Sequence, residues 1–342
     1  MLYVSKYIGS NIPDAVTRIG QSAFRNCDYQ VHSPILPEGL TFIGHDAFYD
    51  SKITGEVWIP STVKTLEEYA LCTSTLNSIY FPDISLPTMG QCVWSQYIKY
   101  GVYVPNYRAY QYLAKANSWG SGYAAKLAVW IMPDASTEMF SSVVPVDFSG
   151  TAVKAYYASA YNKNNTGKEL TMTQVSEIPA RTGVLLTNLQ ANSRQRFDRP
   201  SGSVTAPSTN YLVGTPDTWV DISEEEVGYV WFSATSGPNS QRFVRPTTST
   251  NSTLGSAYLK LTPSEASGKP QVFTNLFPGS GSGSAIPGDV NGDGHVNSVD
   301  VTALYNWLID GNDSDIVNGD QDGDGHITSV DVTVVYNILL GM

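Results

Sequence analysis

The sequence is poor in the residues on which most enzymes depend. Four histidines and three cysteines occur in 342 residues, and charged residues make up 15% of the chain. No Gly-x-Ser-x-Gly elbow, phosphate-binding loop, zinc-ligand spacing or Cys–His pair is present. Carboxylates that hydrolyse glycosides need not be adjacent, and Glu67-Glu68 and Glu224-Glu225-Glu226 are the obvious candidates. Because such runs are usually solvated surface, we predict a non-catalytic protein.

Long apolar runs and basic clusters are also missing. No stretch of 18 apolar residues could cross a membrane. The net charge of −11 argues against binding to nucleic acid. Hydrophobic residues still make up 42% of the chain, enough for real cores, and the length suggests two or three domains. The first residues lack the basic start and apolar run of a signal peptide. Because the calcium loops described below suit the millimolar calcium outside cells, we expect an exported protein whose leader is missing.

A calcium-loop pattern occurs twice near the C-terminus, shifted by 31 residues. Each copy offers oxygen ligands at positions 1, 3, 5, 9 and 12, a backbone carbonyl at position 7, and a turn-forming glycine at position 6. At position 9 a bridging water is an alternative to direct contact. The first copy supplies Asp289, Asn291, Asp293, the carbonyl of His295, Asn297 and Asp300. The second supplies Asp320, Asp322, Asp324, the carbonyl of His326, Thr328 and Asp331. The sequence therefore predicts two calcium ions.

A helix pattern follows each loop, and none precedes it. Val301, Leu304, Tyr305 and Leu308 fall at helical spacing, which predicts one apolar face. From residue 285 onward the chain contains ten aspartates and no lysine, arginine or glutamate. Without calcium these carboxylates repel one another, so we expect this part to be loosely folded or unfolded without metal.

This loop–helix pair resembles a dockerin of type I over residues 287–342. Dockerins dock onto cohesin domains and, like this chain, carry aspartate at position 12. The resemblance implies a cohesin-type partner and a pseudo-twofold docking surface with two possible orientations. A calcium site with only a structural role is the alternative. By resemblance, the partner-facing residues are those at positions 10 and 11 of each loop, which are Ser298, Val299, Ser329 and Val330.

A second repeat occupies the first third of the chain. An apolar residue followed by proline recurs at Pro13, Pro37, Pro60, Pro82 and Pro105, with spacings of 24, 23, 22 and 23 residues. Such a period predicts a solenoid in which each unit contributes a short strand and a bent return.

The repeat unit itself is most regular in its first two copies. It reads Ile-Pro-x-x-Val-x-x-Ile-Gly-x-x-Ala-Phe from Ile12, and Phe24 and Phe48 are expected to stack along the core. Cys27 and Cys72 hold matching positions, so buried thiols are expected rather than a disulfide framework. The unit resembles the BspA-like leucine-rich repeat of secreted and surface proteins of gut and oral bacteria, which is associated with adhesion and protein binding. We assign residues 1–126 to this solenoid, closed by a capping helix within 107–119.

Aromatic residues gather towards the end of this repeat. We expect most of them to seal the end of the solenoid, and the alternative is a carbohydrate-binding surface. That alternative predicts loss of glycan binding when Trp94 or Tyr97 becomes alanine. The group comprises Trp94, Tyr97, Tyr100, Tyr103, Tyr107, Tyr110 and Tyr112.

The remaining residues predict a β-rich middle and a linker. Short strand-like segments at 152–157, 170–175, 183–188, 229–233 and 257–261 alternate with turn-rich segments, which predicts a β-sandwich at 127–277. The order of short sequence motifs in this part of the chain resembles an uncharacterised β-domain of exported Bacteroidetes proteins. The Gly/Ser segment 278–286 is typical of a flexible linker to the dockerin-like part at 287–342.

Together these patterns predict a multidomain, mostly β protein with a small α module, located outside the cell or on its surface. The solenoid is the expected ligand surface, and the calcium module is the expected anchor to a cohesin-type partner. Two alternatives stay open at this point. One is a glycan-binding protein whose calcium module is only structural, and the other is a cryptic glycoside hydrolase.

Overall fold

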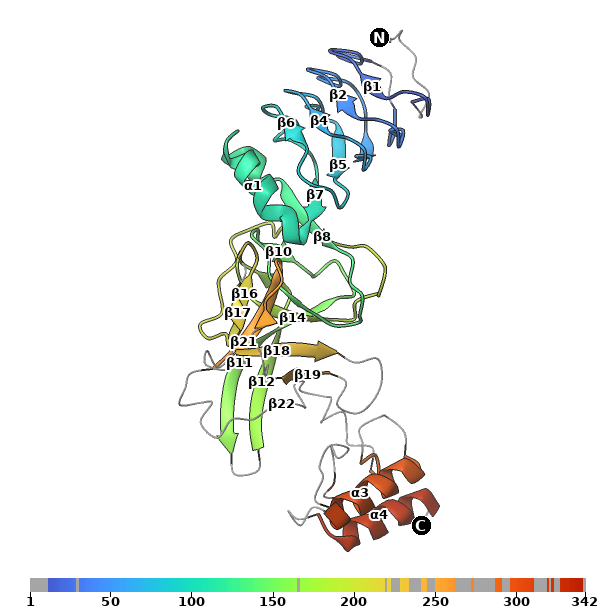
Figure 1. The fold of residues 1–342 in the computed structure, drawn as a ribbon, viewed down its shortest axis with the longest axis vertical. Helices are drawn as coiled ribbons and strands as arrows, with labels where there is room; N and C mark the ends of the chain where they lie inside the picture. The colour runs from blue at the N-terminus through green and yellow to red at the C-terminus, as the bar shows by residue number, and fades with distance from the viewer. Residues whose placement is uncertain are drawn as a thin grey trace.

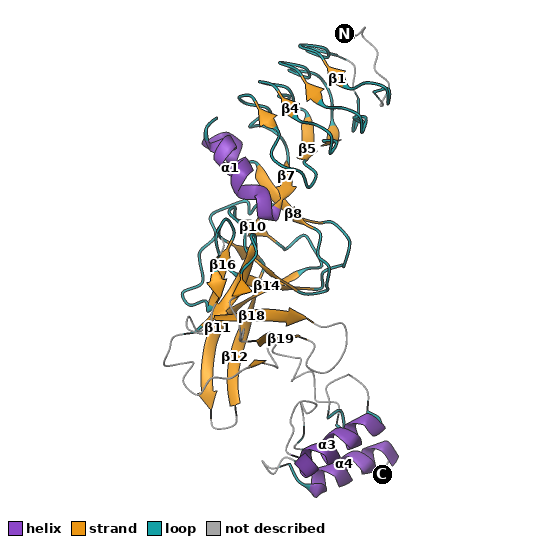
Figure 2. Cartoon of the chain, in the orientation of Figure 1, coloured by secondary structure: helices purple, strands orange, loops and turns teal. Residues whose placement is uncertain are grey.

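The computed structural model describes residues 12–28, 31–164, 167–218, 220–222, 228–233, 241–244, 250–261, 272–273, 287–290, 296–310, 319, 321–322 and 327–340. The described chain is mostly β with few helices (Figure 2). Figure 1 shows three successive parts along the long axis. We call them the repeat region (12–131), the middle region (132–273) and the C-terminal module (287–340).

The repeat region contains two parallel sheets, in the orders β1-β2-β4-β6 and β3-β5-β7-β8. The repeats that begin with β2, β4 and β6 contribute one strand to each sheet, and the first described repeat contributes β1 and the isolated bridge from His32 to Thr54. Equivalent residues of successive units therefore lie side by side. Its elements are β1 (Arg18–Ile19), β2 (Phe42–Ile43), β3 (Gly55–Trp58), β4 (Thr65–Leu66), β5 (Leu76–Tyr80), β6 (Thr88–Met89), β7 (Gly101–Pro105), η1 (Asn106–Arg108), α1 (Ala109–Asn117), α2 (Ser121–Ala124) and β8 (Leu127–Ile131).

Apolar residues at matching positions of these strands form the core of the repeat region. Val57 of β3 pairs with Ile79 of β5, which pairs with Val102 of β7, and all three are buried. The Phe24 and Phe48 rings stack with centroids 4.9 Å apart, which confirms the expected stacking. Coils also approach closely at Gly90, where an added Cβ would lie 2.2 Å from the backbone nitrogen of Glu68, so only glycine fits there.

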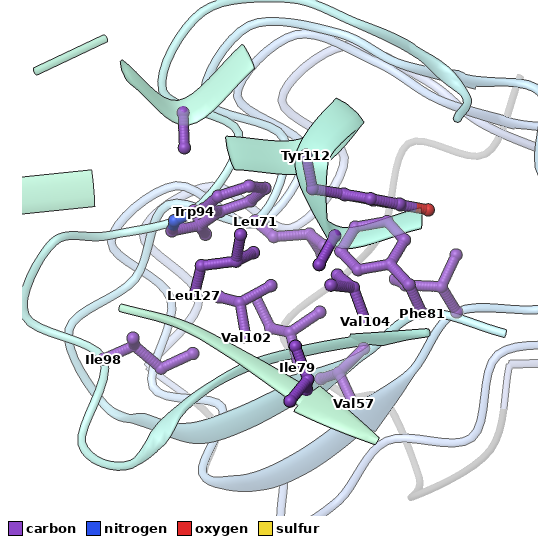
Figure 3. Packing of buried hydrophobic residues seen from close by; sticks show 14 of the residues in the cluster. Val57, Leu71, Ile79, Phe81, Trp94, Ile98, Val102, Val104, Tyr112 and Leu127 are labelled. Carbon is purple, nitrogen blue, oxygen red and sulfur yellow. The ribbon is translucent and has the colours of Figure 1, made fainter. Parts of the chain in front are cut away.

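Two of the seven aromatic residues expected to seal the repeats, Trp94 and Tyr112, are fully buried near the C-terminal end of this core. The Phe81 ring lies close to both, with centroid distances of 6.3 Å to Trp94 and 5.0 Å to Tyr112 (Figure 3). Helix α1, which supplies Tyr112, lies within the segment expected to be helical, and its role as a cap stays a prediction. The suggestion that Trp94 binds a glycan is wrong, because its ring is part of the core. Tyr97 differs, since it is 70% exposed.

The sheet of the repeat region continues into the middle region. β8 pairs in parallel with β7, and β15 (Gln195–Phe197) pairs with β8 in the antiparallel sense. β15 therefore returns from about 65 residues later in the chain to become the edge of the sheet. The division between 126 and 127 stays a prediction.

An aromatic ladder runs across the outer face of this sheet. Trp58, Tyr80 and Tyr103 pair in register, and their rings stack with centroids 4.1 and 4.8 Å apart. Arg194 lies over the Trp58 ring at 4.7 Å, and Arg196 donates a hydrogen bond to the Tyr80 hydroxyl. Arginine side chains of the middle region therefore cover an aromatic face of the repeat region.

The middle region is built from antiparallel strands. Its larger sheets have the orders β12-β11-β14-β9 and β16-β21-β18-β19-β22, with smaller pairs β10-β13 and β17-β20. Its strands are β9 (Glu138–Phe140), β10 (Val146–Asp147), β11 (Lys154–Asn164), β12 (Gly167–Val175), β13 (Glu177–Ile178), β14 (Val184–Thr187), β15 (Gln195–Phe197), β16 (Leu212–Thr215), β17 (Asp221–Ile222), β18 (Gly228–Ser233), β19 (Gln241–Val244), β20 (Thr250–Asn251), β21 (Ser256–Lys260) and β22 (Val272–Phe273).

The five strand segments expected in the middle region are confirmed as β11, β12, β14, β18 and β21. Apolar residues of both larger sheets share one core, which includes Met172 of β12, Leu185 of β14 and Leu259 of β21. The β-sandwich stays a prediction. The expected linker at 278–286 lies outside the described residues.

A second core joins the middle region to the repeat region. Phe140, Phe148 and Phe197 form a cluster of edge-to-face rings with centroids 5.0 to 5.9 Å apart. This cluster is continuous with the buried residues of the repeats, including Val104 and Val129. The two regions therefore bury apolar surface against each other.

The three cysteines, Cys27, Cys72 and Cys92, are free thiols, as expected. They are half-buried rather than fully buried, which corrects the sequence expectation. Burial is the main cause that raises the pKa of the Cys72 thiol to about 11. It is therefore protonated at neutral pH and a poor nucleophile. In the described part of the chain, no helix has both the length and the apolar character needed to span a membrane.

We expect Phe197→Ala to destabilise the repeat and middle regions together. Removing this fully buried ring leaves a cavity in their joint core and should cost about 3–5 kcal/mol. Hydrogen exchange should show lower protection in both β7 and β14. Ile35→Ala is the control, because this residue is 60% exposed and should change stability by less than about 0.5 kcal/mol. Loss of protection in the middle region alone would contradict a shared core.

Candidate calcium and docking site

The C-terminal module is a pair of helices with a small core of its own. Helix α3 spans Ser298–Asp310 and helix α4 spans Ser329–Leu340. They pack side by side (Figure 1). The core is made of a few aliphatic residues, which are Val290, Val301, Ala303, Leu304, Val332 and Val335. Among the described residues, this core is separate from the cores of the repeat and middle regions.

Residues at loop positions 9 and 12 cap the first helix. The Asn297 side chain accepts a hydrogen bond from the backbone nitrogen of Val299 at 2.8 Å. In return, Asp300 Oδ2 accepts one from the backbone nitrogen of Asn297 at 2.8 Å. This reciprocal pair is a capping box, in which each side chain satisfies a donor at the helix start. The other oxygen of Asp300 accepts from Val290 at 2.9 Å, which fixes the beginning of the loop against its end.

The second loop repeats this arrangement. Thr328 accepts a hydrogen bond from Val330 at 3.1 Å, and Asp331 Oδ2 accepts one from the Thr328 nitrogen at 2.7 Å. Asp331 Oδ1 accepts from the backbone nitrogen of Gln321 at 2.6 Å. Burial works to raise the pKa of Asp331, but these backbone hydrogen bonds outweigh it and hold the pKa below its usual value. The carboxylate is therefore ionised at neutral pH.

Two buried carboxylates in this module would be stabilised by a positive charge close to them. Asp300 and Asp331 are both 0% exposed, and residues from 285 onward include no lysine or arginine. A buried anion without a counter-charge is costly, because it has lost its water. Carboxylate oxygens are hard ligands of the kind that calcium prefers, so the chemistry of these two side chains suits this ion.

The structure describes half of the predicted ligands. Asp289 and Asn297 are half-buried, Asp300 is buried, Asp322 is exposed, Thr328 is half-buried and Asp331 is buried. In each loop, the ligand at position 12 bonds to the backbone near the ligands at positions 1 or 3. The predicted ligands Asn291, Asp293, His295, Asp320, Asp324 and His326 lie outside the described residues. The ligand set as a whole stays a prediction.

The helices also carry an apolar surface that faces solvent. The expected partner-facing residues Val299 and Val330 are 55% and 52% exposed, and Ser298 and Ser329 are exposed as well. Exposed apolar residues continue along both helices. We call this set the doubled apolar surface, and it consists of Val299, Tyr305, Leu308 and Ile309 on α3 with Val330, Tyr336, Leu339 and Leu340 on α4.

The predicted apolar face of α3 is partly wrong. Val301 and Leu304 are buried as expected, but Tyr305 and Leu308 are 49% and 37% exposed. Ile309, which the periodicity did not select, is 81% exposed. The sequence did contain a sign of this exposure, because the apolar residues of α3 occupy more than the one stripe that its core requires.

Other candidates from the sequence gain no support as sites. Glu67 and Glu68 lie in a repeat turn, where Glu67 accepts a hydrogen bond from the backbone of His45. Glu224, Glu225 and Glu226 lie outside the described residues. Within the described ranges, no cluster of three or more His, Cys, Asp or Glu side chains could hold a metal ion.

Two family descriptions match the chain. Residues 3–101 match the BspA type leucine rich repeat region in six copies, and residues 287–340 match the dockerin type I domain. The chain has a BspA-type leucine-rich repeat region and a dockerin type I domain. Both are non-catalytic interaction modules, and both are typical of extracellular or surface proteins. No curated protein and no solved structure matches the chain.

We expect Asp331→Asn to weaken calcium binding by at least about tenfold, or about 1.4 kcal/mol. The substitution removes the charge and turns an acceptor into a donor that faces backbone N–H groups. Calcium titration calorimetry on the chelator-treated full chain measures the effect. Asp14→Asn, at an exposed position of the repeat region, is the matched control and should leave the titration unchanged. An unaltered titration for Asp331→Asn would contradict the role of this carboxylate.

Proposed function

We propose that this protein is a non-catalytic binding protein of the cell exterior. Its dockerin, folded around two calcium ions, docks onto a cohesin-type partner, and its repeats form a solenoid that presents a ligand surface. The observation that carries the proposal is the doubled apolar surface. Exposed apolar patches of this kind on a soluble module mark interaction sites.

Calcium prepares this surface by ordering the helix starts. The caps at Asn297 and Thr328 are predicted ligands at position 9, and Asp300 and Asp331 at position 12 are the first-turn acidic residues of α3 and α4. An ion held by these groups would fix the direction of each helix. Val299 and Val330 follow the caps by two residues, so their positions depend directly on the two loops.

The docking surface has near-twofold internal symmetry. Val299 and Tyr305 of α3 correspond to Val330 and Tyr336 of α4, and the four residues are exposed to similar extents, between 48% and 55%. A partner site that fits one helix therefore also fits the other after a half-turn. We propose that either helix can take the leading position.

The repeat region supplies the second binding surface. Tyr97 and Tyr100 remain 70% and 58% exposed, while Trp94 and Tyr112 are buried. Trp58 and Ile35 are 46% and 60% exposed. These residues offer apolar area to a ligand without weakening the core.

The docking proposal is tested with single and double substitutions. Val299→Asp or Val330→Asp alone should leave binding to immobilised cohesin domains within a few fold, because the other helix still docks. The double variant should lose at least about 100-fold, or about 2.7 kcal/mol. Surface plasmon resonance in calcium measures the affinity.

Two controls define what this result means. Calcium titration of each variant should be unchanged, because neither valine is a predicted ligand. A chelator should abolish binding of the natural sequence. If the double variant binds cohesins as well as the natural chain, the doubled apolar surface is not the docking site. If no cohesin domain binds the natural chain in calcium, the calcium module is structural and the docking proposal fails.

A further inference from the structure

A cavity of about 410 Å³ lies where the repeat region meets the middle region. Asn106 and Trp130 line it from the repeat region, and Glu138 and Leu254 line it from the middle region. Its wall is therefore formed by segments that are far apart in the sequence. None of its lining residues belongs to the dockerin.

Glu138 is a carboxylate without a counter-charge. It lies at the start of β9, and its Oε2 atom is buried with no hydrogen-bond partner among the described residues. Burial, with a smaller contribution from the nearby carboxylate of Asp134, raises the pKa of Glu138 to about 7. When Glu138 is ionised, its buried oxygen is therefore a charge that has lost its water.

Asn106, which also lines the cavity, carries a second acceptor without a partner among the described residues. Its Nδ2 donates to the carbonyl oxygens of Ser141 at 2.8 Å and Gly255 at 3.0 Å. These two acceptors fix the orientation of the amide, because only the NH₂ end can donate to them. Its Oδ1 is consequently an acceptor, and it is buried with no partner in the described part of the chain. Asn106 itself is only 4% exposed.

Other charged groups around the cavity do not neutralise Glu138. Asp83 also lines the wall, and it is already engaged by Arg108 and the Tyr107 hydroxyl. Among the described residues that line the cavity, none is a lysine or arginine. Both unsatisfied atoms are acceptors, and the described lining includes the carboxylates of Asp83 and Glu138.

We propose that this cavity binds a primary ammonium group carried on an alkyl chain, such as a lysine side chain. An ammonium group offers three donors and a positive charge, which complements Glu138 and the Asn106 oxygen. The side chains of Trp130, Ile131 and Leu254 provide an apolar and aromatic wall for the methylene stem. A metal ion fits less well, since no cluster of three metal-ligating side chains occurs in the described ranges. This site is separate from the proposed docking function.

The test uses the full chain at pH 8, which is above the pKa of about 7 of Glu138 and at which the ligand amine is protonated. The probe is Nα-acetyl-lysine methylamide, and binding is measured by isothermal titration calorimetry. Its Nε-acetylated derivative has the same stem without the charge. We expect the free amine to bind at least tenfold more tightly than the acetylated form.

Two variants assign the binding to the cavity. Glu138→Gln keeps the side-chain shape and should weaken binding of the amine at least tenfold. Glu177→Gln, on β13 outside the cavity, should leave binding unchanged. Thermal unfolding of both variants shows that they are folded.

Several results would overturn the proposal. These are absence of amine binding to the natural chain, equal binding of the acetylated probe, or undiminished binding to Glu138→Gln. Binding of a neutral monosaccharide such as glucose without binding of the amine would instead assign the cavity to polyols. None of these results bears on cohesin docking, which the valine variants test independently.

Discussion

Parallel pairing of equivalent apolar residues determines how the first two parts of the molecule fit together. Val57, Ile79 and Val102 lie in register because each repeat has nearly the same length. Leu127 of β8 continues the row, although it lies beyond the last proline-marked repeat. Strand β8 therefore forms the edge of the parallel part of the sheet, and β15 of the middle region pairs with this edge and completes the sheet. Its phenylalanine cluster can then extend the core of the repeats without a break.

The dockerin obeys a different constraint, which is electrostatic. Its few aliphatic core residues surround two fully buried aspartates, and no basic side chain from residue 285 onward balances them. Backbone N–H groups provide part of the compensation, and they also hold each loop to its helix. A cation held by the loops would supply the remaining charge balance, and folding of this part would then be linked to occupation of its loops.

Local signals in the sequence predicted much of this architecture. Proline spacing located the repeats, and the doubled loop pattern located the dockerin, because both reflect chemistry within one short unit. The same signals could not place β15, since its pairing with β8 depends on residues far away in the chain. Helical spacing placed Tyr305 in the core, but it could not tell which apolar stripe the neighbouring helix covers. The predicted calcium ligands could be recognised from their local spacing. Glu138 and Asn106, in contrast, line one cavity only because the tertiary fold brings them together.

The Arg196 side chain ties together strands that are distant in the chain. From β15 it donates to Glu56 of β3 at 3.2 Å and to the hydroxyl of Tyr80 of β5, over the stacked rings. Its guanidinium thus links β15 of the middle region to two coils of the repeat region. If the proposed ligand of the repeats and the proposed docking partner pulled on the chain, these linked coils would resist separation from the middle region.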